Sequence, residues 1–202
     1  DALVHDFAGK TLYSGFIDAY SPLTGEAEKV GGKGALHWNP KTHPERRVDL
    51  EYVPAPDLNR QLRAQGIAVR LLAPASGVIQ GTSALVTTGD AGARQAVLKP
   101  RAAFHLSLDP GEGGGYPASA MGAVALLRQG FLDADWYRRA WEAHAKGAPR
   151  PEANAGLEML GEALSGRLPL FLEAPDEIAV LRAHRLAGEF RLAPVLLGSG
   201  QE

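Results

Sequence analysis

The sequence predicts an α/β protein built from parallel strand–helix–strand units. Short apolar runs of strand length alternate with helical patterns at both ends of the chain. The strongest single signal is a long helical stretch at 118–144, where apolar residues recur near helical spacing and Ser119 is available as a cap. No internal repeat and no low-complexity tract interrupts this organisation.

The elements follow from local patterns, taken in chain order. Apolar runs bounded by polar or turn residues predict strands at 12–17, 67–72, 82–88, 168–172 and 192–197. The stretch 96–108 is also strand-like, but Pro100 predicts a bulge or a turn between two short strands. Helices are expected at 57–65, 118–144, 153–164 and 175–190. The segment 25–47 is rich in glycine and proline and predicts a long irregular loop, and glycines 111 and 113–115 predict a flexible connector.

Composition sets limits on function. The chain has 202 residues, 45% of them hydrophobic and 22% charged, which is typical of a soluble globular protein. A net charge of −2 gives no electrostatic reason to expect nucleic acid or an anionic membrane as partner. The absence of cysteine excludes disulfides, thiolate metal sites and cysteine nucleophiles. No apolar run approaches the roughly 18 residues of a membrane span, and the compartment, cytoplasmic or periplasmic, stays open.

The most informative motif lies near the start of the chain. Residues 15–23 read Gly-Phe-Ile-Asp-Ala-Tyr-Ser-Pro-Leu. This stretch resembles the Gly-Phe-Ile-Asp-Ala-His-x-His-Leu pattern of the amidohydrolase superfamily, in which two histidines hold a divalent metal at the mouth of a (β/α)8 barrel. Here Tyr20 and Pro22 stand at the histidine positions. Proline has no donor atom, and a neutral tyrosine is a poor ligand beside imidazole.

The resemblance extends along most of the chain. Asn39-Pro40, the run 66–69 and glycines 77 and 81 are similar to the family's stretch around its second strand. The segment from Tyr116 to Tyr137 resembles a helical insertion of bacterial imidazolonepropionase-like amidohydrolases, which places this insertion at about 116–165. The resemblance therefore implies one domain, 1–202, forming the N-terminal and central part of a TIM-like barrel of the metal-dependent hydrolase type.

The other family ligands can be compared where positions correspond. The strand 168–174 is similar to the one that ends in a ligand histidine, and here that position holds Glu173. The run 197–200 supplies no histidine either. Lys99 is either the family's metal-bridging lysine or a surface lysine beside a turn. We therefore expect no resident metal, and zinc only if this comparison of the ligand positions is wrong.

Other catalytic patterns are absent from the sequence. No complete phosphate-binding loop, no Gly-x-Gly-x-x-Gly after a strand and no Gly-x-Ser-x-Gly occurs. None of the six histidines forms a His-x-His or His-Glu-x-x-His pair. His105 lies in a strand and is expected to be a core or rim residue. Trp136, Tyr137 and Trp141 form an aromatic helix face, which favours core packing or a subunit interface over a ligand platform.

A (β/α)8 barrel needs about 250 residues, and this chain supplies about six barrel strands. Either the rest of the barrel lies in a C-terminal segment or a separate chain, or the chain forms an open α/β sheet complete in itself. Since the chain begins with Asp1 and not with methionine, we also expect an upstream segment. A homo-oligomer is compatible with the pattern.

Two functions are compatible with these residues. The first is a hydrolase of non-peptide C–N bonds with a degenerate metal site, and the second is a catalytically inactive barrel that serves in binding or assembly. In both cases a small-molecule ligand is expected at the carboxyl ends of the strands. The site residues predicted there are Asp18, Tyr20 and Glu173, with Ser76, Gln80 and Ser199 around them. The plainer alternative is that Glu173 pairs with an arginine and Asp18 caps a loop.

Overall fold

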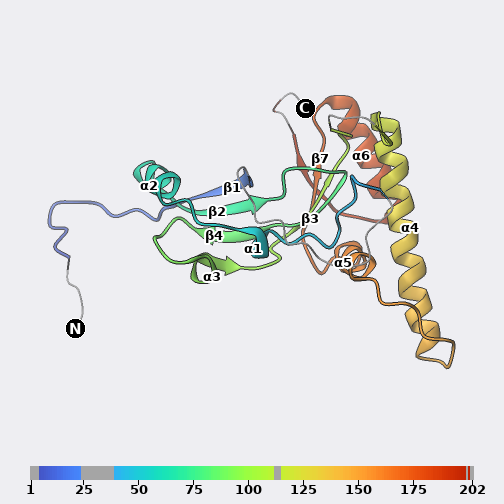
Figure 1. Cartoon of the computed structure of the whole chain (residues 1–202). Coiled ribbons are helices and arrows are strands. Elements are labelled where there is room, and N and C mark those ends of the chain that lie inside the picture. Colours follow the sequence, from blue (N-terminus) through green and yellow to red (C-terminus); the bar gives the residue numbers. More distant parts are fainter. Residues whose placement is uncertain (1–4, 24–38, 112–114, 199, 201–202) are drawn as a thin grey trace.

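The computed structural model describes residues 5–23, 39–111, 115–198 and 200 (Figure 1). Its strands form two open four-stranded sheets, which lie in the left and right halves of Figure 1. The first sheet has the order β1-β2-β4-β5, with β1 at Phe16–Pro22, β2 at Ile67–Ala73, β4 at Ala84–Thr87 and β5 at Val97–Lys99. The second has the order β3-β6-β7-β8, with β3 at Ile79–Thr82, β6 at Phe104–Ser107, β7 at Leu170–Glu173 and β8 at Val195–Leu197.

Strand direction matches the predicted units at both ends of the chain. β1 pairs parallel with β2, and β6, β7 and β8 pair parallel in that order. The remaining pairs are antiparallel: β3 pairs with β6, β4 with β2, and β5 with β4. The protein is therefore a mixed α/β structure, and its described strands do not close into a barrel.

The two sheets are joined at Ser83. β3 and β4 follow each other directly, but β3 pairs with β6 of the second sheet and β4 pairs with β2 of the first. Ser83 between them is fully buried and exchanges two backbone hydrogen bonds with Ala102 and Ala103. The strand expected at 82–88 is present as β4, but it begins only at Ala84, because Thr82 ends β3 and the chain changes sheets at Ser83.

The first strand also differs from its prediction. The apolar run 12–17 predicts a strand there, but β1 begins at Phe16, because its partner β2 begins at Ile67 and Phe16 is the first residue in register. Residues 5–15 lie outside any strand and are exposed (Figure 1). The expected break at Pro100 is confirmed, since it separates β5 from β6.

The described part of the chain has six helices, and none is long and apolar enough to cross a membrane. They are α1 (Val48–Glu51), α2 (Pro56–Ala64), α3 (Ala93–Ala96), α4 (Ala120–His144), α5 (Ala155–Leu164) and α6 (Glu177–Phe190). The three longest begin at side-chain caps: Ser119, Asn154 and Asp176 accept hydrogen bonds from backbone N–H groups three residues later.

The main core lies between the second sheet and helices α4, α5 and α6. Its fully buried members include Ile79, Phe104, Leu106, Leu127 and Phe131. A smaller core covers one face of the first sheet and includes Val48, Leu72 and Val86. Two separate cores explain why the molecule has two halves in Figure 1.

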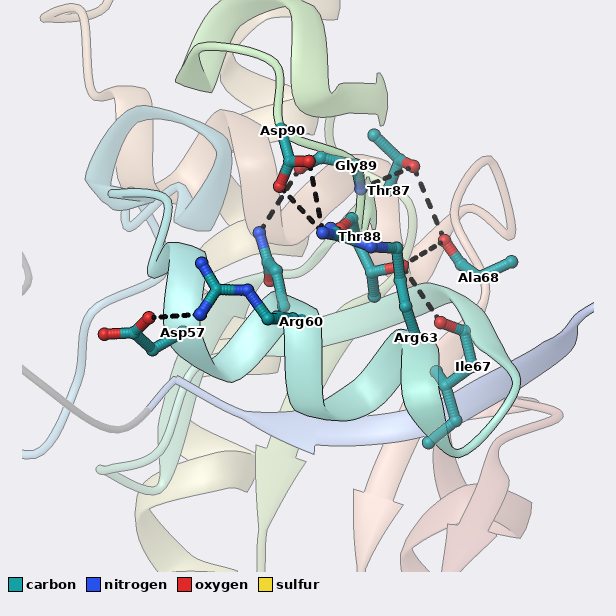
Figure 2. Close-up of polar contacts among 10 residues, drawn as sticks. Asp57, Arg60, Arg63, Ile67, Ala68, Thr87, Thr88, Gly89 and Asp90 are labelled. Carbon is teal, nitrogen blue, oxygen red and sulfur yellow. Dashed lines mark hydrogen bonds and ion pairs between the residues drawn. The ribbon is translucent and has the colours of Figure 1, made fainter.

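Helix α2 is fixed to the first sheet by the polar contacts drawn in Figure 2. Arg63 donates to the carbonyl oxygen of Thr88 and forms an ion pair with Asp90, with N–O distances of 2.9 and 3.1 Å. The Thr88 hydroxyl donates to the carbonyl oxygens of Ile67 and Ala68, at 2.9 and 3.2 Å. These contacts lie where β2 begins, so they anchor the helix at the sheet end opposite the carboxyl ends of the parallel strands.

Candidate functional site

The second sheet has one apolar face and one polar face. Phe104 and Leu106 of β6, with Leu172 of β7, belong to the helix-covered core. Since side chains alternate along a strand, the residues between them face the other way. This second face carries His105 and Ser107 from β6 and Phe171 and Glu173 from β7.

Tyr20 of the first sheet reaches this polar face. Its ring centroid lies 6.1 Å from that of His105, and the His105 ring stacks on Phe171 at 5.0 Å with an interplanar angle of 16°. His105 is 1% exposed, and its Nε2 atom has no hydrogen-bond partner among the described residues. Strands β1, β6 and β7 therefore bring three rings together beneath the carboxyl end of the sheet.

Burial determines the protonation states in this cluster. Burial lowers the pKa of His105 to about 4, so its imidazole is neutral at physiological pH. Burial and, second, the negative charge of Glu173 raise the pKa of Tyr20. The Tyr20 hydroxyl therefore stays protonated and can donate a hydrogen bond.

A cleft of about 360 Å³ opens above this cluster, at the carboxyl ends of β6 and β7. The cleft is lined by residues of three loops and three strands: Pro40, Lys41, His43, Ala75, Ser76, Gly77, Gln80, Ser107, Asp109, Pro110, Gly111 and Glu173. Ser107 and Glu173 are direct neighbours in the β6–β7 register. The cleft therefore continues upward from the polar face that holds His105.

The two basic groups at the cleft already have partners. The Lys41 ammonium donates to the carbonyl oxygens of Pro110 and Pro117, at 2.7 and 3.0 Å. Arg46, which donates to Ser76 at 3.4 Å, forms a 2.7 Å ion pair with Glu51. The Arg46 charge is compensated by Glu51, whereas the Lys41 ammonium keeps its charge and is held in place by two neutral carbonyl oxygens.

Glu173 is the group left without a partner. Its carboxylate receives no hydrogen bond and no ion pair from the residues that the structure describes, although its backbone oxygen accepts from Leu108. The second carboxylate, Asp109, accepts from the backbone N–H of Gly111 at 2.9 Å. The lining of the cleft thus has two carboxylates, Glu173 and Asp109, and one ammonium group, Lys41, and no hydrogen bond or ion pair joins Lys41 to Glu173 among the described residues.

The structure brings some of the predicted site residues together. Tyr20 and Glu173 are close enough for the charge of one to shift the pKa of the other, and Ser76 and Gln80 share the cleft with Glu173. The Asp18 carboxylate accepts from the backbone N–H of Tyr20 at 3.2 Å, and no contact with Glu173 is present among the described residues. Ser199 lies outside the described residues.

The donor set does not fit a histidine-rich zinc centre. Tyr20 is held neutral, Pro22 is exposed without a donor atom, and Glu173 supplies one carboxylate. Within the described ranges, no three histidine, aspartate or glutamate side chains gather closely enough to hold a metal ion. Lys99 is exposed on β5, the last strand of the first sheet, as expected for a surface lysine.

Several residues of this site are not predictable from the sequence. The sequence indicates only a core or rim position for His105, and its place under Tyr20 depends on how two sheets meet. Lys41 and His43 come from the segment predicted as an irregular loop, whose described part runs beside β3 through backbone bridges at Thr42 and Arg47. Asp109 directly follows β6, and a carboxylate after a strand is the one signal that points to it.

Comparison with known proteins supports the fold. No protein-family model and no curated protein matches the sequence. A solved structure, described as an amidohydrolase from Thermotoga maritima MSB8, matches with a TM-score of 0.75 and 22% sequence identity. The alignment covers 96% of this chain and 55% of that chain, so this chain spans about half the length of the structure it matches. At this identity the likeness establishes that the chain shares its fold with part of an amidohydrolase.

Proposed function

We propose that this chain is part of an amidohydrolase-like barrel domain that binds a small molecule carrying N–H donors or a positive charge. The observation that carries this proposal is the unpaired carboxylate of Glu173 in a cleft where Lys41 is bonded to two backbone carbonyls and Arg46 to Glu51. A carboxylate in such a place gains about 1.5–3 kcal/mol from a charged hydrogen bond. A ligand with an amine, guanidine, imidazole or cyclic urea group supplies that bond.

The neighbouring groups support ligand orientation. Gln80 is 4% exposed and lines the cleft with Ser76 and Ser107, so amide and hydroxyl groups face the ligand beside the carboxylate. Such a combination of a few convergent polar groups in a concave site is typical of small-molecule recognition. The Tyr20 hydroxyl, kept protonated, adds a donor below Glu173.

Hydrolysis of non-peptide C–N bonds is the second candidate. The fold likeness to an amidohydrolase favours it, and an unpaired carboxylate facing a cleft is a suitable proton acceptor for an attacking water. Because the donor set does not fit the family's histidine-held metal, we assign no step to a metal ion. Under this candidate, Glu173 is the base.

Binding is tested by calorimetry with the purified protein against defined probes: agmatine, imidazole, hydantoin and an uncharged amide. We expect the cationic and N–H-rich probes to bind and Glu173→Gln to weaken them about 10- to 100-fold, the equivalent of one charged hydrogen bond. Glu158→Gln, which removes an exposed carboxylate on α5, is the matched control and leaves affinity unchanged. Equal affinity of Glu173→Gln and wild type rejects the proposal.

The two candidates are separated by metal content and turnover. We expect well below one equivalent of transition metal per chain and no hydrolysis of hydantoins, imidazolones or dipeptides. Turnover that a chelator abolishes would instead establish metal-dependent hydrolysis and overturn our assignment of Tyr20, Pro22 and Glu173. Turnover that persists with chelator but disappears in Glu173→Gln would favour the second candidate.

We also propose that the barrel is completed by further strands, supplied by the same polypeptide or by a second one. Among the described strands, β1 pairs only with β2 and β8 pairs only with β7. Unpaired strand edges expose backbone donors and acceptors, which proteins normally cover.

A further inference from the structure

Helix α4 presents an unusual outer face. A row of its residues along one side is exposed throughout: Met121, Ala125, Gln129, Leu132, Trp136, Arg139 and Ala143. Three of these are large apolar side chains, with exposed fractions of 79% for Met121, 51% for Leu132 and 59% for Trp136. We call this row the α4 seam. The opposite side of the helix, with Leu127 and Phe131, packs into the core.

The spacing of the seam has the pattern of a helix that pairs with another helix. Its members follow one another at intervals of three or four residues, which places them on one stripe of the helix surface. Five of the seven are apolar, whereas the outward stripe of a solvated surface helix is normally polar. From Met121 to Ala143 the stripe is about 33 Å long at 1.5 Å per residue.

The spacing of the seam residues from Ala125 to Ala143 is symmetric about Ala134. From Ala125 to Ala143 the intervals are four, three, four, three and four residues, and they read the same in both directions. Antiparallel packing of two copies about this point places Leu132 against Trp136 of the second copy. The same operation places Gln129 against Arg139 and Ala125 against Ala143. Large residues therefore meet large ones, polar meet polar and small meet small.

We propose that two copies of this chain associate through their α4 seams, antiparallel, around a two-fold axis near Ala134. A symmetric contact of this kind uses the same patch on both copies, which a self-complementary stripe supplies. The charges agree with it. Gln129 donates to Asp133 at 2.7 Å and Arg139 forms a 3.0 Å ion pair with Asp135, so each copy brings a carboxylate-bonded amide and a carboxylate-paired guanidinium to this contact.

The exposed apolar side chains of the seam supply area for such a contact. A specific interface buries about 800 Å² per partner, and one tryptophan alone can bury about 150–250 Å². Trp136 and Leu132 expose apolar surface at the centre of the seam, and Met121 exposes it at one end. Helix α6, which is linked to α4 by the Arg128–Glu189 ion pair at 2.7 Å, also exposes Ile178 and Leu181.

The oligomeric state of the purified protein tests the proposal. Light scattering at micromolar concentration is expected to give twice the chain mass for the wild type and the single-chain mass for Leu132→Glu and for Trp136→Glu. Leu50→Glu is the matched control, because Leu50 on α1 is 55% exposed, close to the 51% of Leu132, and lies outside the seam. This control is expected to remain dimeric. A monomeric wild type, or a dimer that both seam variants retain, overturns the proposal.

Cysteine cross-linking tests the antiparallel register. The chain contains no cysteine, so single replacements at Ala125 and Ala143 react without background. A short bismaleimide is expected to join an equimolar mixture of Ala125→Cys and Ala143→Cys far better than either variant alone. Efficient cross-linking of each variant to itself shows a parallel pair and rejects the register. If the wild-type mass is doubled but the partner is a different polypeptide by mass spectrometry, the second-copy assignment is wrong.

Discussion

At the scale of single residues, His105 has the clearest energetic consequence. The ring is held between Tyr20 and Phe171, away from water, and its Nε2 atom has no partner in the described part of the chain. A buried polar atom of this kind costs about 1–3 kcal/mol when it is unsatisfied. Because burial keeps the imidazole neutral, the larger cost of burying an unpaired charge does not arise.

We predict that protonation of His105 makes the protein acid-sensitive. In the unfolded chain its pKa is near 6.5, and in the folded protein burial lowers it to about 4. Between these values the unfolded state binds the proton and the folded state does not, so stability falls as the pH falls from about 6.5 to about 4. The loss is at most roughly 3 kcal/mol.

Chemical denaturation across this pH range measures the effect. His105→Phe, which keeps a stacking ring, is expected to reduce the slope of stability against pH. His184→Gln is the control, because His184 is exposed on α6 and its removal should leave the slope unchanged. An unchanged slope in His105→Phe would assign the acid sensitivity to other groups.

The charges of Glu173, Tyr20 and the proposed ligand influence one another. The charge of Glu173 contributes, after burial, to the raised pKa of Tyr20. A cationic ligand on Glu173 would offset that charge, so ligand binding and the ionisation of Tyr20 are coupled by electrostatics. The two side chains come from different sheets, and only their joint position produces this coupling.

At the scale of elements, β3 depends on the segment that runs beside it. Backbone bonds join Lys41 to Val78, His43 to Ile79 and Arg46 to Thr82. This close approach is possible because Gly81 has a φ of +97° and no side chain. A Cβ atom at Gly81 would lie 2.4 Å from the carbonyl oxygen of Arg46.

We predict that Gly81→Ala destabilises the protein by about 2 kcal/mol or more, because the new residue combines a strained backbone with a steric clash. Gly161→Ala is the matched control. Gly161 lies inside α5, and a Cβ atom added there would meet no other atom within 4 Å, so this change should stabilise the helix by about 0.5–1 kcal/mol. Denaturant unfolding of both variants checks the signs, and an equal effect of the two would show that the contact with Arg46 is not significant.

At the scale of the whole molecule, the chain passes from the second sheet to the first at Ser83. Each sheet has an edge strand, β1 or β8, with exposed apolar residues. Phe16 and Ile17 of β1 are 71% and 65% exposed, and Val195 and Leu196 of β8 are 50% and 42% exposed. A sheet that continues beyond β1 and β8 would cover these residues.

We predict that β1 and β8 are paired on both sides in the intact protein. Hydrogen exchange should then show their amide protons protected to a degree comparable with β6, which is central in the second sheet. Fast exchange in β1 and β8 together with slow exchange in β6 would contradict completion of the barrel. Mass spectrometry of the same sample shows whether a second polypeptide is present.

Local patterns in the sequence were sufficient for the four longest helices and for most strands, but not for the short helices α1 and α3 or for strand β3. Helical spacing and caps placed α4, α5 and α6 to within a few residues, and Pro100 marked the break between β5 and β6. These features depend on interactions between residues near one another in the chain. The motif at 15–23 pointed to the amidohydrolase fold on the same local basis, and the structural comparison supports that fold.

The sequence by itself therefore determined the class of fold, the main elements and the place of Glu173 at the end of a strand, whereas Tyr20, expected after the first strand, lies inside β1. Only the tertiary structure decided that the chain changes sheets at Ser83, that the His105 ring lies next to the Tyr20 ring, and that the carboxylate of Glu173 has no partner among the described residues. Those properties depend on contacts between residues far apart in the sequence. No local spacing records such contacts, because they exist only once both sheets have formed.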